Sequence, residues 1–458
     1  MRRLVAFVLS ATLISTTAEA DSVELDPAVA ANVLVIHARS PDLHDDVFAK
    51  MGGSSVESRA FLYCFATPYV DLGDHTELQE TIDYFDTGRR NSFNRHSLAA
   101  GVSWNLRYVL GGRPAHFREE IHATDARWAL VLFGGNDAQN HNERIYARRL
   151  VYLVERLEAM GVVPVLGTAT PRRNKINDRW IQRFNAITEA IATHWQLPYV
   201  DYHRAMSELP RKGLARDGVH PNILGRGGVR AACQLTEKGL RYGNNARNLL
   251  TLEMLEALRR TVASTAAGTA ADAGTGAGTD AGTGADAGTD AGAGTGADAG
   301  ADAGTDAGTS TDAGTGADAD TGADAGADAG TSAGTGAGTG TAITLEDLPF
   351  SLLVDKRSLG LGELPGGCGA LKPGAWTYRV PVAVEEPARL RMSALDLDRY
   401  QPRVFWVRIS EDGSRCVKRR NQTLEVAASP GLWDLIVEVP ERAAQKGEML
   451  ILIDRNPR

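Results

Sequence analysis

Residues 264–341 constrain the fold of this 458-residue chain more than any other feature. They are almost wholly Ala, Gly, Thr, Asp and Ser, in near-repeats such as Thr305-Asp306-Ala307-Gly308. The segment offers no large apolar side chain, so burial cannot offset the entropy lost on ordering its backbone. We predict a flexible, low-complexity linker that separates two folded domains, residues 21–263 and residues 342–458.

The charge of the chain is concentrated in this linker. The formal net charge is −8, and residues 264–341 contain twelve Asp and no Lys or Arg. The rest of the chain is therefore near balance, at about +4. Because a nucleic-acid-binding protein needs a clustered basic face, we expect no nucleic-acid partner.

Residues 1–20 have the pattern of a secretory signal peptide. Arg2 and Arg3 precede an apolar run from Leu4 to Ile14, and Ala18-Glu19-Ala20 is a small-x-small cleavage site. The run is too short for a resident membrane helix, and no other run has the length to span a bilayer. We therefore expect a protein that is secreted, periplasmic or at the cell surface, without a transmembrane segment after cleavage; an uncleaved anchor is the alternative.

Four cysteines are compatible with disulfides in an exported protein. Cys64 and Cys233 lie before the linker, and Cys368 and Cys416 lie after it. The simplest prediction pairs the cysteines within each half, and four free thiols are the alternative. No CxxC spacing occurs, so the sequence indicates neither a zinc site nor a redox motif.

The segment before the linker alternates strand and helix patterns. Apolar runs at 128–133, 162–166 and 197–200 predict buried strands, and Phe48 to Gly52 reads as another. Helices are expected near 142–160, ending at Gly161, and after Asp178 as N-cap. This order predicts an α/β fold with a parallel sheet, whose sites form beyond the carboxyl ends of the strands.

The segment after the linker has a different pattern. Residues alternate with period two from Trp376 to Val384, and further strand candidates lie at 404–409, 433–439 and 449–453. We predict an all-β sandwich. Its aromatic residues are interpreted as core, although stacking on sugar rings is an alternative for Trp376, Tyr378, Trp406 and Trp433.

Two motifs before the linker suggest chemistry. In Asp217-Gly218-Val219-His220, the carboxylate can bind the Nδ1 of the histidine and leave Nε2 free to act as a base. In Gly134-Gly135-Asn136-Asp137, a side-chain amide follows a strand and can donate to a developing oxyanion. The alternative for Asn136 and Asp137 is a role in shaping the turn.

These motifs resemble the SGNH hydrolase superfamily, which includes GDSL-type esterases and lipases. The corresponding blocks here are Gly52-Gly53-Ser54, Gly101, Gly134 to Asp137, and Asp217 to His220, so the resemblance covers residues 45–225. It implies a three-layer, flavodoxin-like parallel sheet and a serine esterase that needs no metal or organic cofactor. It also implies Ser54 as nucleophile, His220 as base and Asp217 as its orienting partner.

The resemblance further implies an oxyanion hole formed by the N–H groups of Ser54 and Gly101 and the Asn136 side chain. The first block departs from the family, because Gly53 stands where the family has Asp. Ser55 is therefore an alternative nucleophile, although we prefer Ser54. We expect substrate specificity to reside in loops such as 66–92 and 170–178.

The expected function is hydrolysis of carboxylic esters through an acyl-enzyme, with an acetylated polysaccharide or a lipid as substrate. One alternative is a non-catalytic surface or glycan-binding protein on the same scaffold, which the altered first block favours. Another is a transferase in which a sugar hydroxyl replaces water.

Overall fold

The structure is a computed structural model that describes residues 23–225, 228–274, 342–346, 348–356, 359, 375–397, 403–408, 415–418, 423–440 and 447–455. The expected signal peptide and most of the expected linker lie outside the described residues. The described residues up to 267 and from 342 onward belong to one compact unit. No helix of the described residues is both long enough and apolar enough to cross a membrane.

Before the linker, four parallel strands form one sheet in the order β1-β2-β3-β4. They are β1 (His44–Gly52), β2 (Ala126–Leu132), β3 (Val163–Gly167) and β4 (Tyr199–Val200). β2 and β3 are buried at every position because neighbouring elements cover both faces. A single parallel bridge from Gly52 to Ala100 places one more segment beside β1. The order is therefore flavodoxin-like, with its outer strand reduced to one bridge.

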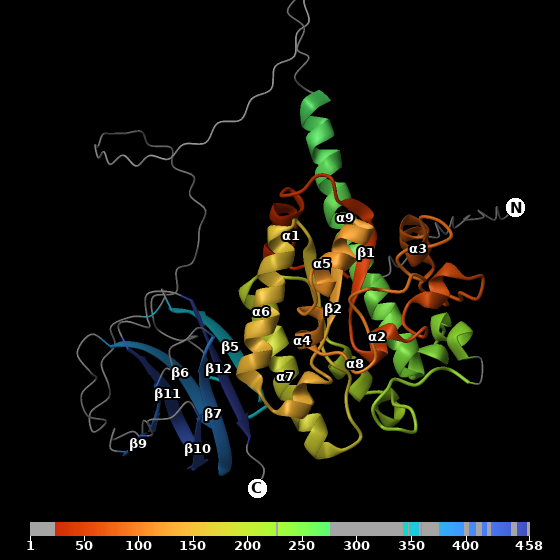
Figure 1. Ribbon diagram of the computed structural model, residues 1–458. Coiled ribbons are helices and arrows are strands. Elements are labelled where there is room, and N and C mark those ends of the chain that lie inside the picture. Colours follow the sequence, from red (N-terminus) through yellow and green to blue (C-terminus); the bar gives the residue numbers. More distant parts are fainter. Residues whose placement is uncertain are drawn as a thin grey trace, which may run out of the picture. The chain divides into compact units, whose positions relative to one another are not determined.

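Helices cover both faces of this sheet, as the α/β pattern predicts. Figure 1 shows the strands between α6 and α7 on one side and α9 on the other. The longest helices are α6 (Glu143–Ala159), α7 (Lys175–His194) and α9 (Gly243–Gly274). The shorter ones are α1 (Pro27–His37), α2 (Ser54–Glu57), α3 (Gln79–Phe85), α4 (Leu106–Val109), α5 (His116–Thr124) and α8 (Tyr202–Ser207), with 3₁₀ turns η1 (Tyr63–Ala66), η2 (Thr76–Leu78), η3 (Asp137–Asn140), η4 (Pro210–Gly213), η5 (Gly228–Cys233) and η6 (Gly239–Arg241).

One prediction about a helix end was wrong. The N-cap of α7 is Asn174, whose Oδ1 accepts from the N–H groups of Ile176 and Asn177. Asp178 lies in the first turn instead and binds His203 and Lys212. α9 continues to Gly274, into the alanine-rich start of the expected linker, and alanine is the best helix former.

The described residues after the linker form two antiparallel sheets, in the orders β10-β7-β12-β5 and β6-β11-β8-β9. Both sheets contribute to one apolar core, to which Met392 and Ile451 belong on the first and Val380 and Leu435 on the second. This is the sandwich that the sequence predicts. The strands are β5 (Phe350–Asp355), β6 (Trp376–Val384), β7 (Ala388–Asp396), β8 (Arg403–Arg408), β9 (Arg415–Lys418), β10 (Thr423–Ala428), β11 (Gly431–Val439) and β12 (Glu448–Arg455).

Cys64 and Cys233 form a disulfide between η1 and η5, as predicted. The second predicted pair joins Cys368 to Cys416, and Cys368 lies outside the described residues. Of the aromatic residues considered for sugar stacking, Trp433 is buried in the sandwich core, and Trp376 and Tyr378 pack half-buried against it.

Candidate active site

The candidate nucleophile lies where β1 turns abruptly into α2. Ser54 is the first residue of this short helix, and Gly52 ends the strand. A Cβ atom on Gly52 would lie 2.4 Å from Val56 Cγ2 and 2.9 Å from the carbonyl oxygen of Leu132, so only glycine fits. The tight turn thus places Ser54 at the carboxyl end of the sheet, where sites form in open α/β folds.

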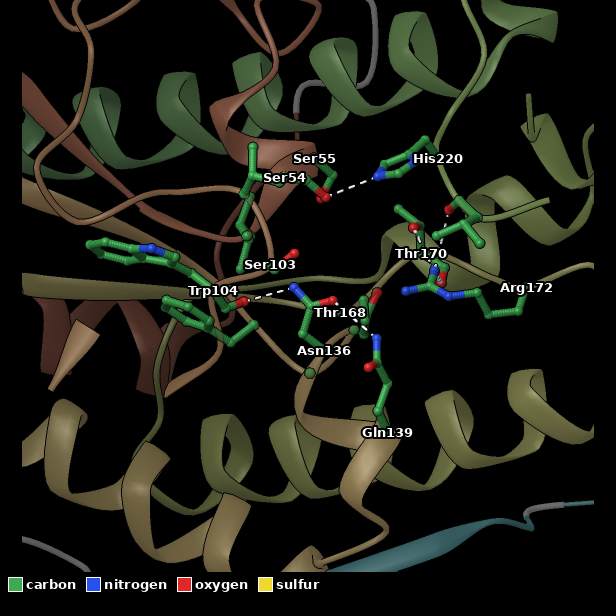
Figure 2. A pocket seen from close by; sticks show the side chains of 18 of the residues that line it. Ser54, Ser55, Ser103, Trp104, Asn136, Gln139, Thr168, Thr170, Arg172 and His220 are labelled. Atoms are coloured by element: carbon green, nitrogen blue, oxygen red, sulfur yellow. Dashed lines mark hydrogen bonds between the residues drawn. The ribbon is translucent and has the colours of Figure 1, made fainter. Parts of the chain in front are cut away.

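Ser54, His220 and Asp217 form a continuous chain of hydrogen bonds. The Oγ of Ser54 lies 2.9 Å from Nε2 of His220, and Nδ1 of His220 lies 2.7 Å from Oδ2 of Asp217. An ionised carboxylate only accepts, so Nδ1 carries the proton and Nε2 is left to accept from the serine hydroxyl. Figure 2 shows His220 facing the serine across the cavity.

The loop that carries His220 is fixed through Asp217. Its Oδ1 accepts from the N–H groups of Val219 and His220, at 2.9 and 3.0 Å. Desolvation acts to raise the pKa of Asp217, but the hydrogen bonds from His220 and from these N–H groups outweigh it and lower the pKa to about 2. Gly218 supplies the positive φ of +72° that the turn requires. Asp217 is therefore an ionised, well-oriented partner for the imidazole.

Ser55, the alternative nucleophile, also lines the cavity. No hydrogen bond joins it to His220 among the described residues, whereas its backbone carbonyl accepts from Arg247 Nη1 at 3.4 Å. The structure thus brings Ser54 rather than Ser55 to the histidine.

The amide of Asn136 is held over the cavity by two contacts. Its Nδ2 donates to the carbonyl oxygen of Trp104 at 2.8 Å, and its Oδ1 accepts from Gln139 Nε2 at 3.3 Å (Figure 2). The amide has two N–H hydrogens, so one remains for a ligand oxygen. Both Asn136 and Ser54 line the same cavity of about 310 Å³.

Gly101 does not lie where the family resemblance implies. Its N–H donates to the carbonyl oxygen of Gly52 at 3.1 Å, which continues the pairing beside β1, and Val102, Ser103 and Trp104 line the cavity in its place. Gly101 is nevertheless needed as glycine, because a Cβ there would lie 2.6 Å from the Trp104 ring. The prediction of Gly101 as an oxyanion donor is therefore corrected.

Asp137 supports the turn that presents Asn136. It is buried, and its carboxylate accepts from the N–H groups of Leu106 at 3.1 Å and Gly134 at 3.2 Å. Burial raises the pKa of Asp137 to about 6, against these hydrogen bonds. The role in shaping the turn thus belongs to Asp137, whereas Asn136 projects into the cavity.

The cavity lining matches the predicted specificity loops only in part. Thr170 and Arg172 belong to the loop 170–178 that was expected to set specificity, but no residue of the loop 66–92 is among those that line the cavity. Arg247 comes from α9, where no sequence pattern distinguishes it. The described residues contain no group of three or more His, Cys, Asp or Glu side chains arranged to hold a metal ion.

Comparison with known families agrees with this geometry. Residues 73–226 match the model of the GDSL-like lipase/acylhydrolase family. The chain carries a GDSL-like lipase/acylhydrolase domain of the SGNH hydrolase superfamily. It is accordingly a hydrolase that acts on esters, and the alternative of a non-catalytic scaffold is not supported. The matched range includes Asn136, Asp217 and His220 but starts after Ser54, so the assignment of Ser54 depends on the geometry of the site.

Solved structures also resemble the chain. A GDSL-like lipase from Bacteroides thetaiotaomicron is 17% identical, with 50% of this chain and 98% of the other covered and a TM-score of 0.32. An acetylxylan esterase from Geobacillus stearothermophilus is 16% identical, with 45% and 93% covered and a TM-score of 0.32. No curated protein matches the chain.

Proposed function

We propose that this hydrolase cleaves carboxylic esters of polar alcohols through an acyl-enzyme on Ser54. The observation that carries the proposal is the chain of hydrogen bonds from Ser54 through His220 to Asp217, with steps of 2.9 and 2.7 Å. The same three residue types in the same contacts make serine nucleophilic on several unrelated folds.

In the first half-reaction, His220 Nε2 takes the proton of Ser54 as Oγ attacks the ester carbonyl. The oxygen of the tetrahedral intermediate accepts from the free N–H of Asn136 and from the backbone N–H of Ser54, which donates no other bond among the described residues. His220 then gives the proton to the leaving alcohol, and the acyl group stays on Ser54.

In the second half-reaction, water replaces the alcohol. His220 takes a proton from water, the resulting hydroxide attacks the acyl-enzyme, and the acid leaves as Ser54 recovers its proton. Throughout, ionised Asp217 stabilises the imidazolium that forms next to it.

The cavity favours an acetylated carbohydrate over a long-chain lipid. Polar groups of Asn136, Gln139, Thr168 and Thr170 line it, together with guanidinium groups, and such a wall suits hydroxyl-rich alcohols. A fatty acyl chain would instead need a continuous apolar channel. We further propose that the enzyme is exported, a proposal that depends on the signal-peptide pattern of residues 1–20.

The test compares p-nitrophenyl acetate with p-nitrophenyl octanoate on the full-length protein. We expect the acetate ester to be preferred and Ser54→Ala and His220→Ala to lower kcat by at least about 10³-fold, since each triad member is essential to the unit. Ser55→Ala is the matched control and should keep kcat within about threefold. Full activity in Ser54→Ala with loss in Ser55→Ala would overturn the assignment.

A further inference from the structure

The walls of the active-site cavity contain two arginines and no carboxylate. Arg172 and Arg247 line it, and none of the cavity residues is Asp or Glu. Asp217 and Asp178 act on Arg172 from outside the cavity, but Asp217 is bound to His220 and Asp178 is bound to His203 and Lys212. Because charges removed from water are normally paired, a cavity with this imbalance is suited to a ligand that brings a negative charge.

Arg172 is built into the wall with one side of its guanidinium left open. Nη1 donates to the carbonyl oxygens of Thr170 at 2.8 Å, Pro171 at 3.1 Å and Val219 at 3.4 Å. Nη2 donates to nothing among the described residues. The backbone N–H of Arg172 is also fixed, since it donates to Asp178 at 2.7 Å. The guanidinium is therefore held in place with free donors.

The second glycine of the Gly134-Gly135 pair makes room for these donors. A Cβ built on Gly135 would lie only 2.8 Å from Arg172 Nη2, so any other residue there would push the guanidinium away. Figure 2 shows the Arg172 head group extending toward Thr168 and Asn136, on the floor of the cavity. The Gly134-Gly135 motif therefore precedes the proposed oxyanion donor, Asn136, and also leaves space for the guanidinium of Arg172.

Arg247 adds a second positive charge on the serine side. It is 1% exposed, its guanidinium lies 4.6 Å from the Phe61 ring and 5.2 Å from the Tyr202 ring, and its Nε has no hydrogen-bond partner. Burial lowers the pKa of Arg247 to about 10, so it remains charged at neutral pH. A buried cation beside Ser55 raises the positive potential of the whole cavity.

The position of Arg172 indicates which part of the substrate is charged. His220 must protonate the leaving alcohol, so the alcohol lies against His220 during the first half-reaction. Arg172 contacts Val219, the residue before His220, and therefore borders the same side. We infer that the alcohol part of the substrate bears a carboxylate bound by Arg172, which makes an acetylated acidic sugar the substrate class. This inference rests on the proposed function.

The test uses two methyl glycosides acetylated on the same hydroxyl: methyl glucuronoside, which has a free carboxylate, and methyl glucoside, which has a hydroxymethyl group in its place. The full-length wild type should show a kcat/KM at least about tenfold higher for the glucuronoside, mainly through KM, since hydrogen bonds to charged groups are the strong ones. Arg172→Gln should lose this preference, so that its kcat/KM values for the two substrates agree within about threefold.

Two variants serve as controls. Arg172→Lys should keep part of the preference, because it retains the charge but loses the planar fork. Arg148→Gln changes the net charge equally on the exposed face of α6, outside the cavity, and should keep the full preference. The inference would be overturned if the wild type showed no preference, or if Arg172→Gln lowered kcat/KM on both substrates by the same factor.

Two further experiments distinguish a failure of the inference from a failure of the proposed function. A preference for succinylated over acetylated methyl glucoside would place the charge on the acyl group and contradict it. If no ester is hydrolysed in a Ser54-dependent way, the proposed function is rejected, but the inference about Arg172 can still be tested. Calorimetry then measures ligand binding to Ser54→Ala, which needs no catalysis. Ser54→Ala should bind methyl glucuronoside at least about tenfold more tightly than methyl glucoside, and Ser54→Ala with Arg172→Gln should bind both equally. Equal binding by Ser54→Ala itself would also overturn the inference.

Discussion

Gly53, the residue at which the chain departs from its family, is explained by the space around it. A Cβ atom at Gly53 would lie 2.9 Å from Asn136 Nδ2 and 3.1 Å from the carbonyl oxygen of Trp104. These two atoms form the hydrogen bond that orients the amide. The family's Asp would therefore disturb the proposed oxyanion donor in this chain, although it is the usual residue there.

We predict that restoring the family motif at Gly53 lowers activity. Gly53→Asp should reduce kcat on p-nitrophenyl acetate by at least about tenfold, because loss of one oxyanion-hole donor typically costs about 10² to 10³. Steady-state kinetics measure the effect, and an unchanged circular dichroism spectrum shows that the variant is folded. A kcat equal to or above that of the wild type would show that the amide tolerates the side chain.

Asp137 predicts a pH dependence of stability. Its folded pKa of about 6 lies above the ordinary value of about 3.9, so the stability that its carboxyl contributes is fully present below about pH 4 and is lost as pH rises through 6. Asp137→Asn lacks this titration. Relative to the variant, the wild type should lose about 2 kcal/mol of unfolding free energy between pH 4 and pH 7.

Urea denaturation of both proteins at the two pH values measures this difference. Asp83→Asn, an exposed position on α3, is the matched control and should show no change relative to the wild type. Parallel stability curves for the wild type and Asp137→Asn would mean that the carboxyl titrates at its ordinary pKa.

At the scale of elements, burial decided which strands were predictable. The apolar run 128–133 corresponds to most of β2 (Ala126–Leu132), because a strand covered on both faces is mainly apolar; the buried Arg127 near its start is the exception. β7 was not predicted, since Arg389 and Arg391 alternate with its buried residues and break the apolar run. The N-cap of α7 was assigned wrongly because Asn174 and Asp178 are both favourable N-cap residue types, and only the structure shows which side chain turns back to the helix.

The disulfide joins two elements that are distant in the sequence, η1 and η5. Cys64 and Cys233 are 169 residues apart, and both are fully buried. On the chain-entropy model, closing a loop of this length stabilises the folded state by about 5 kcal/mol. Replacing both cysteines by alanine should therefore lower the unfolding free energy by up to about 5 kcal/mol, as measured by denaturant titration. An unchanged midpoint would show that the bridge constrains little in the unfolded chain.

At the scale of the whole molecule, the sequence predicted site residues that lie in one local motif better than residues that only folding brings together. Asp217 and His220 are three residues apart, so their contact follows from one turn. Ser54 needed the resemblance to a family, since it meets His220 across 166 residues of sequence. Arg172 and Arg247 reach the cavity from separate elements, and no local pattern in the sequence indicates that they do so.

The distribution of site residues also predicts where mutations leave catalysis unchanged. All residues assigned to the reaction lie between 54 and 220, whereas Trp433 is buried in the core of the sandwich after the linker. Trp433→Ala should destabilise the sandwich by about 3 to 5 kcal/mol. Its kcat on p-nitrophenyl acetate at 25 °C should equal that of the wild type, and a loss of more than about threefold would show that the sandwich supports the active site.

The central claim is that Ser54 is the nucleophile, and its covalent capture tests this most directly. The full-length protein is treated with a fluorophosphonate, which reacts with serines activated by a neighbouring base, and the modified residue is located by peptide mass spectrometry. We predict one adduct on Ser54, retained in Ser55→Ala and absent from Ser54→Ala and His220→Ala. An adduct on Ser55 in the wild type, or no adduct in an enzyme that still hydrolyses esters, would contradict it.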